Sequence, residues 1–314
     1  MGKYVFGVDI GGTTIKLGLF TTAGKLVEKF AIPTKSGEQL LPSVAKAIID
    51  KLAEIGLTTN DLHGVGVGVP GPVNEDGVVL IGVNIGWLEP VAVESDLSAL
   101  LNGTVIYVTN DANIAAVGEM WQGAAKGVNS AIMFTLGTGV GGGVIVNGEV
   151  INGCNGSGGE IGHLVAVTEG GAQCGCGKTG CLETVTSATG IVRMAKELLT
   201  TSDTSSSLRS LATVEAKDVF DAAKTGDELA LAVVDRVGFY LGLAAANLAA
   251  TTNPEVFIFG GGVSYAGAIL LDAIRKYYGQ FAFSSVKETP FVLASLGNDA
   301  GIIGGASLAT GGLL

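Results

Sequence analysis

The sequence predicts an α/β protein built from two similar halves. Short apolar runs that are typical of strands alternate along the chain with longer segments of helical period. Each half also contains a strand, a turn of glycine and threonine, and a second strand, with the sequences GVDIGGT from residue 7 and FTLGTGVGG from residue 134. This repetition predicts a duplicated architecture in which two phosphate-binding loops face each other across a cleft.

Size and charge narrow the classes of function. The chain has 314 residues, enough for two domains, and 18 Lys and Arg against 29 Asp and Glu give a formal net charge of −11. Because an acidic surface repels phosphate backbones and anionic lipids, we expect neither nucleic acid nor a membrane as a partner. The N-terminal sequence has no charged segment followed by an apolar one, which favours a cytoplasmic protein.

The first half opens with a hairpin around a candidate phosphate loop. Residues 5–10 form an apolar run, and residues 15–20 alternate like a second strand. The turn between them, from Gly11 to Thr14, combines a bare backbone with hydroxyl and N–H donors, as a phosphate cradle requires. Asp9 at the strand end suits Mg²⁺ brought in by a nucleotide and held through water. An ordinary hairpin turn is the alternative.

The rest of the first half predicts a sheet with polar groups at its edge. Residues 38–55 have helical spacing, and the apolar run 64–69 is typical of a central strand covered on both faces. Asn84 lies close to Trp87 in the sequence and offers an amide that suits a sugar hydroxyl. An ordinary turn with a packed tryptophan explains this pair equally well.

Asp111 lies where a strand runs into a helix. It follows the predicted strand 105–108, within the sequence NDAN, and precedes the predicted helix 114–122. Open α/β sheets bind their ligands at such junctions, so Asp111 is a candidate site residue. Its alternative role is that of a helix N-cap.

The second half repeats this organisation. The uncharged run 237–254 is interrupted by glycine and asparagine, so we interpret it as part of a buried helix rather than a membrane span. The predicted elements are a strand at 130–136, a turn from Gly137 to Gly139, glycines 141–143 leading to a return strand at 144–146, helices at 188–199, 214–223 and about 230–250, a polar surface loop at 200–207, a strand at 256–259, a turn from Gly260 to Gly262 suited to adenine or ribose, and a segment at 302–313 that packs on the first domain.

A glycine-rich stretch, residues 159–183, concentrates metal-ligating side chains. It contains Glu160, His163, Cys174, Cys176, Cys181 and Glu183. Three thiolates and one imidazole suit tetrahedral Zn²⁺ and leave no open position for water, which predicts a structural rather than a catalytic metal. A disulfide with an unrelated histidine is the alternative, although Cys174 and Cys176 are too close to pair without strain. The remaining cysteine, Cys154, is expected to be buried.

Five motifs together resemble the ROK family of sugar kinases and repressors. They are DIGGT from Asp9, NDAN from Asn110, LGTGVGGG from Leu136, CGCGKTGCLE from Cys174 and GGGVS from Gly260. The resemblance implies an actin/hexokinase-like (ribonuclease H-like) duplicated α/β fold with an interdomain cleft. It also implies a smaller domain formed by residues 1–113 and 299–314, and a larger domain at 114–298 that carries the zinc loop.

The resemblance further implies ATP-dependent phosphorylation of glucose to glucose 6-phosphate, with Asp111 as the general base. It assigns the sugar to Gly71, Asn84, Asn110, Asp111, Glu160, His163 and Glu183. It assigns zinc to His163, Cys174, Cys176 and Cys181. It assigns ATP with Mg²⁺ to Asp9, Gly11, Gly12, Thr13, Thr14, Lys16, Gly137, Thr138, Gly139, Gly260, Gly261 and Gly262.

Several alternatives stay open at this point. Another hexose, such as N-acetylmannosamine, mannose or fructose, is compatible with the same motifs, and polyphosphate is a second candidate donor. A sugar-sensing repressor is less favoured, because only eight residues precede Asp9 and the net charge opposes DNA binding. For the assembly we expect a homo-oligomer, a symmetric dimer or tetramer.

Overall fold

The computed structural model describes residues 2–311, which fold into two compact units. The first unit comprises the described residues up to Asn129, then Gly143–Gly159, and those from Ser295 onward. The second comprises Ser130–Gly142 and Glu160–Ala294. The domain boundaries inferred from the sequence stay a prediction, and the two compact units differ from them mainly at 114–129 and 143–159.

The first unit is built on a five-stranded sheet in the order β3-β2-β1-β4-β7. The hairpin strand β2 pairs antiparallel with β1, as predicted, whereas β4 and β7 extend the sheet in parallel. The strands are β1 Tyr4–Ile10, β2 Thr14–Thr21, β3 Leu26–Pro33, β4 Leu62–Val69 and β7 Ile106–Asn110, and a separate small sheet pairs β5 Val78–Val79 with β6 Val91–Ala92.

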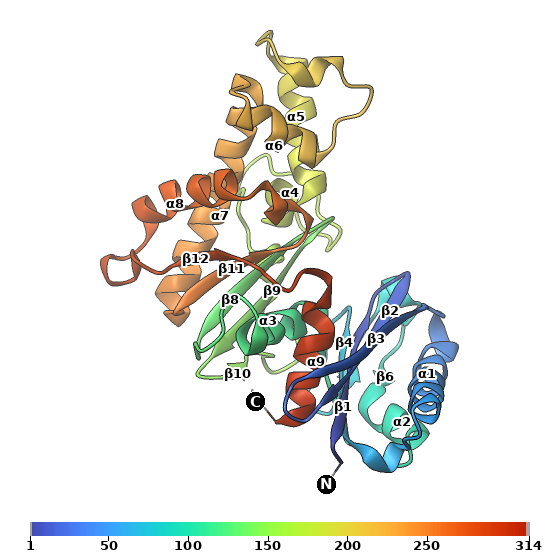
Figure 1. Ribbon diagram of the computed structural model, residues 1–314. Helices are drawn as coiled ribbons and strands as arrows, with labels where there is room; N and C mark the ends of the chain where they lie inside the picture. The colour runs from blue at the N-terminus through green and yellow to red at the C-terminus, as the bar shows by residue number, and fades with distance from the viewer. Residues whose placement is uncertain (1, 312–314) are drawn as a thin grey trace. The chain divides into compact units, whose positions relative to one another are not determined.

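Helices cover both faces of this sheet (Figure 1). One face packs on α1 and α2 around the fully buried Phe6, Leu17 and Ile48, and the other packs on α9, which in turn contacts α3. This explains why β4 is apolar at almost every position. The helices of this unit are α1 Leu40–Glu54, α2 Val93–Leu100, α3 Asp111–Gln122 and α9 Ala300–Thr310.

The second sheet has the order β10-β9-β8-β11-β12, the same arrangement as the first. Its two last strands, β11 and β12, run parallel, as β4 and β7 do in the first sheet. The predicted duplication is therefore confirmed. The strands are β8 Ala131–Leu136, β9 Val140–Val146, β10 Glu149–Val150, β11 Val256–Gly260 and β12 Phe291–Leu293.

One prediction for this sheet was wrong. The return strand, expected at 144–146 after the glycines at 141–143, begins at Val140 and includes those glycines, and the chain passes from the second unit to the first within that strand. Glycine is uncommon in strand interiors, so composition placed these residues before the strand. At Gly143 a side chain would contact α3, because a methyl group there would lie 2.6 Å from the Cβ of Ala116.

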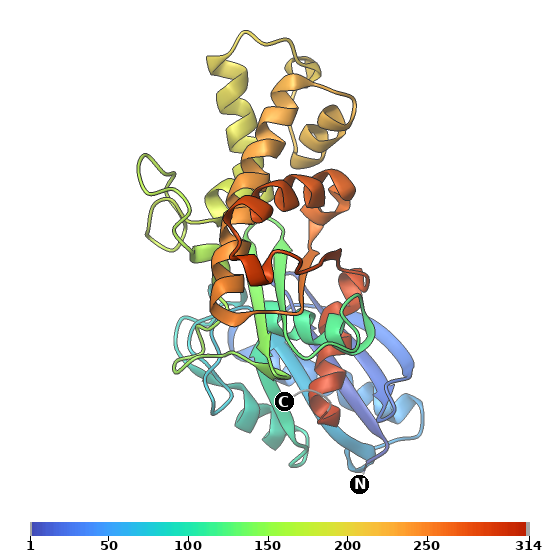
Figure 2. The ribbon, with the colours of Figure 1, turned by 90° about the vertical axis from the view of Figure 1, so that its left-hand side faces the viewer.

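The helices of the second unit pack around α7. Figure 2 shows α7 from the side. Helix α7 is long and apolar enough to cross a membrane, but it contacts α5, α6 and α8, and residues such as Val233, Val237 and Leu241 are fully or almost fully buried. It is a core helix, as predicted. The helices are α4 Glu183–Thr186, α5 Ala188–Thr201, α6 Ala216–Lys224, α7 Glu228–Thr252 and α8 Ala268–Phe281.

The segment predicted at 302–313 packs on the first domain as expected and forms helix α9, Ala300–Thr310. Residues 312 and 313 of that prediction lie outside the described part of the chain. Helix α9 approaches the backbone of its neighbours very closely. A methyl group at Gly66 in β4 would lie 2.0 Å from the carbonyl oxygen of Gly305, and one at Gly304 would lie 1.8 Å from that of Ile114 in α3. Glycine is required at these positions because any side chain would separate the three elements.

Replacing Gly304 by alanine should destabilise the protein. The added methyl group meets a backbone atom that cannot rotate away, so we expect a loss of about 1–3 kcal/mol in the free energy of unfolding. Gly279→Ala is the matched control, because Gly279 also lies in a helix and has open space around its Cβ position. This control should gain about 0.5–1 kcal/mol. Urea unfolding of both variants measures the difference, and equal stabilities would contradict the close contact.

Candidate active site

In the first unit the predicted phosphate turn follows β1. It is closed by a hydrogen bond from the Gly11 N–H to the Thr14 carbonyl, 3.1 Å, and by one from the Thr34 hydroxyl to the Gly11 carbonyl, 2.6 Å. The Asp9 carboxylate lies 3.3 Å from the Lys16 ammonium group. Burial raises the pKa of Asp9 above its ordinary value, and Lys16 acts in the opposite direction. A bound cation would favour the charged carboxylate in the same way as Lys16.

The carboxyl ends of β4 and β7 bring further predicted residues together. The Asn110 side chain donates to the Gly71 carbonyl, 3.2 Å, and accepts from the Ala112 N–H, 2.8 Å. Asn110 is therefore the N-cap of α3, and Asp111 is the first residue of the helix. The helix cap expected in this group is therefore Asn110, and the Asp111 carboxylate also accepts the Ala112 N–H, at 2.9 Å.

Asn84 lies beside the phosphate turn of the same unit. The backbone carbonyl oxygen of Asn84 would be 3.3 Å from a methyl group at Gly12. Trp87, three residues later, donates from its indole nitrogen to the Gly37 carbonyl, 3.2 Å. The packed tryptophan of the alternative reading is present, and it fixes the loop that carries Asn84. The first unit thus groups the turn at Gly11 and Gly12 with Asn84.

In the second unit the two predicted glycine turns are neighbours. The turn after β8 is closed by the Gly137 N–H and the Gly139 carbonyl, 2.9 Å apart. Gly261, at a φ of +80° that favours glycine, packs against this turn, since a methyl group on it would lie 2.5 Å from the Leu136 carbonyl. Bare backbone from two strands is therefore available to one ligand.

Glu183 joins the turn after β8 to the cysteine cluster. One of its oxygens accepts the Val140 N–H at 2.9 Å, and the other lies 3.5 Å from the Cys174 sulfur. Glu160, three residues before His163, has a carboxylate oxygen 4.0 Å from His163 Nε2. The structure therefore brings together the three predicted sugar-binding residues of this unit, because all of them flank the cysteine cluster.

The predicted zinc ligands converge on one point. The four ligand atoms of His163, Cys174, Cys176 and Cys181 all lie within 4.8 Å of one another. His163 Nδ1 and the Cys174 sulfur are 3.7 Å apart, and the sulfurs of Cys176 and Cys181 are 3.6 Å apart. A tetrahedron with bonds of about 2.3 Å has edges of about 3.8 Å, so these residues fit Zn²⁺. The segment that carries them forms the yellow-green loops of Figure 2.

The cysteines are free thiols, so the disulfide alternative is not present in this structure. Burial raises the pKa of Cys174 to about 12, whereas hydrogen bonding to the Lys178 N–H lowers that of Cys176. Zinc would have to displace the proton of the buried thiol, as metal binding to cysteine generally requires. Cys154 is exposed, so its predicted burial was wrong. It lies outside the helices and strands, in the segment between β10 and the metal loop.

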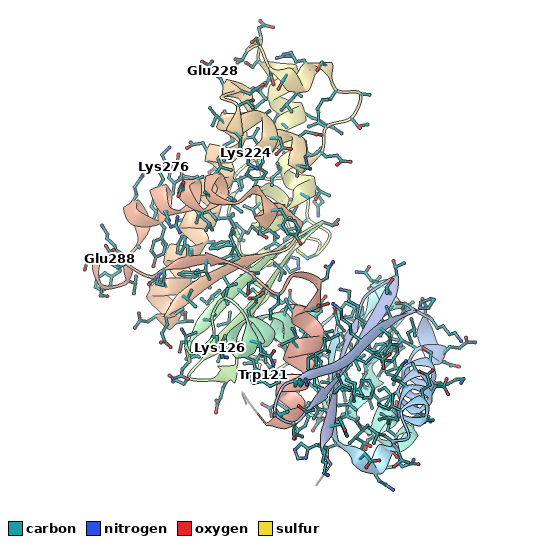
Figure 3. The ribbon with its side chains drawn as sticks, in the orientation of Figure 1. Trp121, Lys126, Lys224, Glu228, Lys276 and Glu288 are labelled. Carbon is teal, nitrogen blue, oxygen red and sulfur yellow. The ribbon has the colours of Figure 1, made fainter. Side chains whose placement is uncertain are left out.

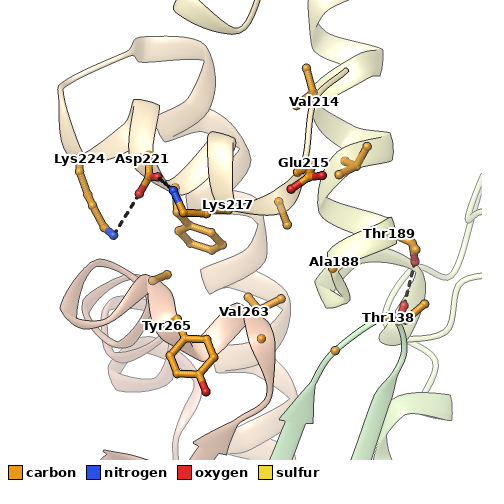
Figure 4. Close-up of a pocket in the computed structure, with 16 residues that line it drawn as sticks. Thr138, Ala188, Thr189, Val214, Glu215, Lys217, Asp221, Lys224, Val263 and Tyr265 are labelled. Carbon is orange, nitrogen blue, oxygen red and sulfur yellow. Dashed lines mark hydrogen bonds and ion pairs between the residues drawn. The ribbon is translucent and has the colours of Figure 1, made fainter. Parts of the chain in front are cut away.

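A large cavity of about 920 Å³ opens beside the turn of Thr138 (Figure 4). Sequence reasoning found Gly137, Thr138 and Gly262 but missed most of its wall. The wall comes mainly from α5, α6 and the segment after Gly262, with Ala188, Val192, Val214, Phe220, Val263 and Tyr265 as apolar members and Glu215, Lys217, Asp221 and Lys224 as charged members. The signal for this wall was weak, because its residues are spread over segments far apart in the sequence.

The comparisons with known proteins decide the family. The ROK family model matches residues 5–311. The chain belongs to the ROK family. A glucokinase of Halalkalibacterium halodurans is 46% identical over 315 residues, covering 98% of this chain and 94% of that protein. A glucokinase of Thermotoga maritima is 38% identical, covering 97% and 96% respectively.

Solved structures confirm the predicted ROK fold. A ROK family glucokinase from Streptomyces griseus, in complex with glucose and AMPPNP, superposes with a TM-score of 0.77 at 33% identity and covers 98% of this chain and 100% of that one. The predicted actin/hexokinase-like fold class is therefore confirmed. The roles of the individual site residues stay predictions.

Removing one cysteine of the cluster should remove the metal. We expect the purified protein to contain about one zinc per chain and Cys181→Ser to retain much less, because a hydroxyl is a poor ligand for Zn²⁺. Cys154→Ser is the matched control and should keep its zinc, since it leaves the cluster intact. Elemental analysis by mass spectrometry measures both. Equal zinc contents in the two variants would contradict the assignment.

Proposed function

We propose that this ROK-family protein is a hexose kinase that transfers the γ-phosphoryl group of ATP to glucose, giving glucose 6-phosphate. The observation that carries the proposal is the near-full-length similarity to glucokinases, at 46% identity for the Halalkalibacterium halodurans protein. The arrangement of the residues in each unit supports it. The acceptor is an alcohol, so the reaction needs a group that takes a proton and groups that hold the phosphates.

Asp111 is proposed as the general base that takes the proton of the attacking hydroxyl. It is the first residue of α3, directly after the capping residue Asn110, so the backbone at this point is fixed by hydrogen bonds. The Asn110 side chain also reaches the Gly71 carbonyl, which ties the helix start to the loop after β4. The Asp111 carboxylate itself accepts the Ala112 N–H at 2.9 Å, and a carboxylate fixed at a helix start supports the proposed role of general base.

The phosphates are assigned to the glycine turns. Backbone N–H groups in such turns neutralise anionic oxygens without requiring a side chain. Mg²⁺, when bound with the nucleotide, would reduce the charge on the phosphates, and Asp9 is the residue of this chain suited to hold it. The adenosine is assigned to the cavity beside Thr138, where Val263 and Tyr265 provide apolar and aromatic surface.

The sugar is assigned to residues that can exchange hydrogen bonds with several hydroxyl groups. Glu160 and Glu183 accept, His163 donates or accepts from the nitrogen that does not bind zinc, and the Asn84 amide does both. A zinc ion bound by the cysteine cluster would order the sugar-binding loop and would take no part in the phosphoryl transfer. We also propose a cytoplasmic location and a homo-oligomer, in keeping with the sequence.

A panel of sugars tests the substrate. In a coupled assay of ADP release, we expect glucose to give the highest kcat/KM. We expect N-acetylmannosamine, mannose and fructose to fall at least about tenfold below it, since a buried polar group left unpaired strongly disfavours the wrong substrate. ATP and polyphosphate are compared as donors with the best sugar. A higher kcat/KM for any other hexose would overturn the assignment to glucose.

Replacing Asp111 should abolish turnover without abolishing sugar binding. We expect Asp111→Ala to lower kcat by a factor of about 10² to 10⁴, the usual contribution of a general base. Glucose should still bind in calorimetry, because other residues supply most of the contacts. Asp76→Ala, at an exposed turn position of the same unit, is the control and should keep full activity. Near-normal turnover of Asp111→Ala would end the assignment.

A further inference from the structure

Glu119 is a buried carboxylate to which the proposed chemistry gives no role. It lies in α3, eight residues after Asp111, and 0% of the residue is exposed to solvent. An ionised carboxylate has two acceptor oxygens and no donor, so burying it is costly unless several donors surround it. The structure supplies these donors from two separate segments of the chain.

The donors are mainly backbone N–H groups. One oxygen of Glu119 accepts from the Ser295 N–H at 2.9 Å and from the Leu296 N–H at 2.8 Å. The other accepts from the Ala124 N–H at 2.8 Å and from the Ser295 hydroxyl at 3.2 Å. The Glu119 carbonyl adds bonds from Gly123 and Ala125, 3.1 and 3.0 Å. A single residue therefore fixes both segments.

The two segments lie at crossing points of the chain. Ala124 is five residues before Asn129, the last residue before the chain first passes into the second unit, and Ser295 is the first residue after its final return. Ser295 also precedes the start of α9 by five residues. Glu119 thus attaches the returning chain to α3 shortly before α9 begins.

Helix α9 in turn contacts the proposed catalytic elements of the first unit. Its residue Gly301 lies against Asp9, since a methyl group there would be 2.7 Å from the Asp9 carboxyl carbon. Its residue Ala300 packs on α3, with its carbonyl oxygen 2.3 Å from a methyl group placed at Gly118. Trp121, near the end of α3, packs against the apolar cluster that α9 forms with β1 and β2 (Figure 3). A shift of the start of α9 would therefore displace Asp9 and α3 together.

We infer that Glu119 is a positioning residue for phosphoryl transfer. By binding the 295–296 backbone it holds α9 in register with α3, and this register keeps Asp111 and Asp9 in place. The inference rests on the proposed function, because it takes Asp111 as the base. It differs from a purely structural role in its consequence: loss of the carboxylate should lower turnover even in a protein that remains folded.

The test is Glu119→Gln, which keeps the shape of the side chain but places an NH₂ group against N–H donors. We expect kcat for glucose to fall by about 10- to 100-fold, the cost of a displacement of about 1 Å at the reacting groups. The glucose dissociation constant, measured by calorimetry, should change by less than about twofold. Hydrogen exchange at residues 295–299 and 123–126 should become faster.

Asp227→Asn is the matched control. Asp227 is also a carboxylate that accepts from backbone N–H groups, those of Ala230 at 3.0 Å and Ser207 at 2.8 Å, but it caps α7 in the second unit. This variant should lose thermal stability and keep its kcat. The inference is overturned if folded Glu119→Gln retains kcat within about twofold of the wild type, or if Asp227→Asn loses as much turnover.

A second variant covers the case in which Glu119→Gln does not fold. Gly123→Ala would place a methyl group 2.1 Å from a Glu119 oxygen and 2.8 Å from the Glu119 Cα, so the carboxylate must move and the backbone beside it must adjust. The same kcat criteria then decide the question. The wild-type protein separates the two proposals. If the wild-type protein does not phosphorylate glucose, the proposed function fails. If the wild-type protein is active and Glu119→Gln has the same kcat, only the positioning role is overturned.

Discussion

The contact of α9 with the backbone of its neighbours is the constraint on which the first unit depends. Gly304 and Gly305 allow the helix to lie directly on α3 and β4, closer than any side chain would permit. The sheet, α9 and α3 therefore behave as one packed layer system, since interiors at this density transmit displacement rather than absorb it. Asp9 and Asp111 both belong to elements of this system, so their positions are linked through helix packing.

In the second unit, the loop at residues 159–183 has no apolar core of its own. The stretch around Cys174 and Cys181 contains many glycines and few large side chains, so packing alone gives it little stability. A bound metal would replace that packing. Glu183 connects the loop to the turn after β8 through the Val140 N–H, so the cysteine cluster and the glycine turn are part of one local structure.

Sequence reasoning succeeded where a local pattern has one physical reading. Strands β1, β4 and β11 and helices α5 and α7 were predicted because short apolar runs flanked by glycine or proline indicate strands, and longer segments of helical period indicate helices. Strand β3 and helix α8 were not predicted. Strand β3 is largely exposed, so it has few of the apolar residues that mark a strand. Helix α8 follows the glycine turn at Gly260–Gly262, which was interpreted only as a ligand-binding turn. The glycines of β9 were placed before the strand, because the reason for Gly143 within it is the neighbouring α3, which the sequence does not show.

The sequence by itself determined the family, the duplicated α/β architecture and the four candidate zinc ligands, because spacing and side-chain chemistry are local properties of the chain. Tertiary structure alone decided that the Asn110 side chain reaches the Gly71 carbonyl, and that Val214, Phe220 and Tyr265 share a cavity. It also decided that Glu119 binds a segment 176 residues away in the chain. Such contacts depend on how distant backbone groups meet, and neither composition nor periodicity specifies that.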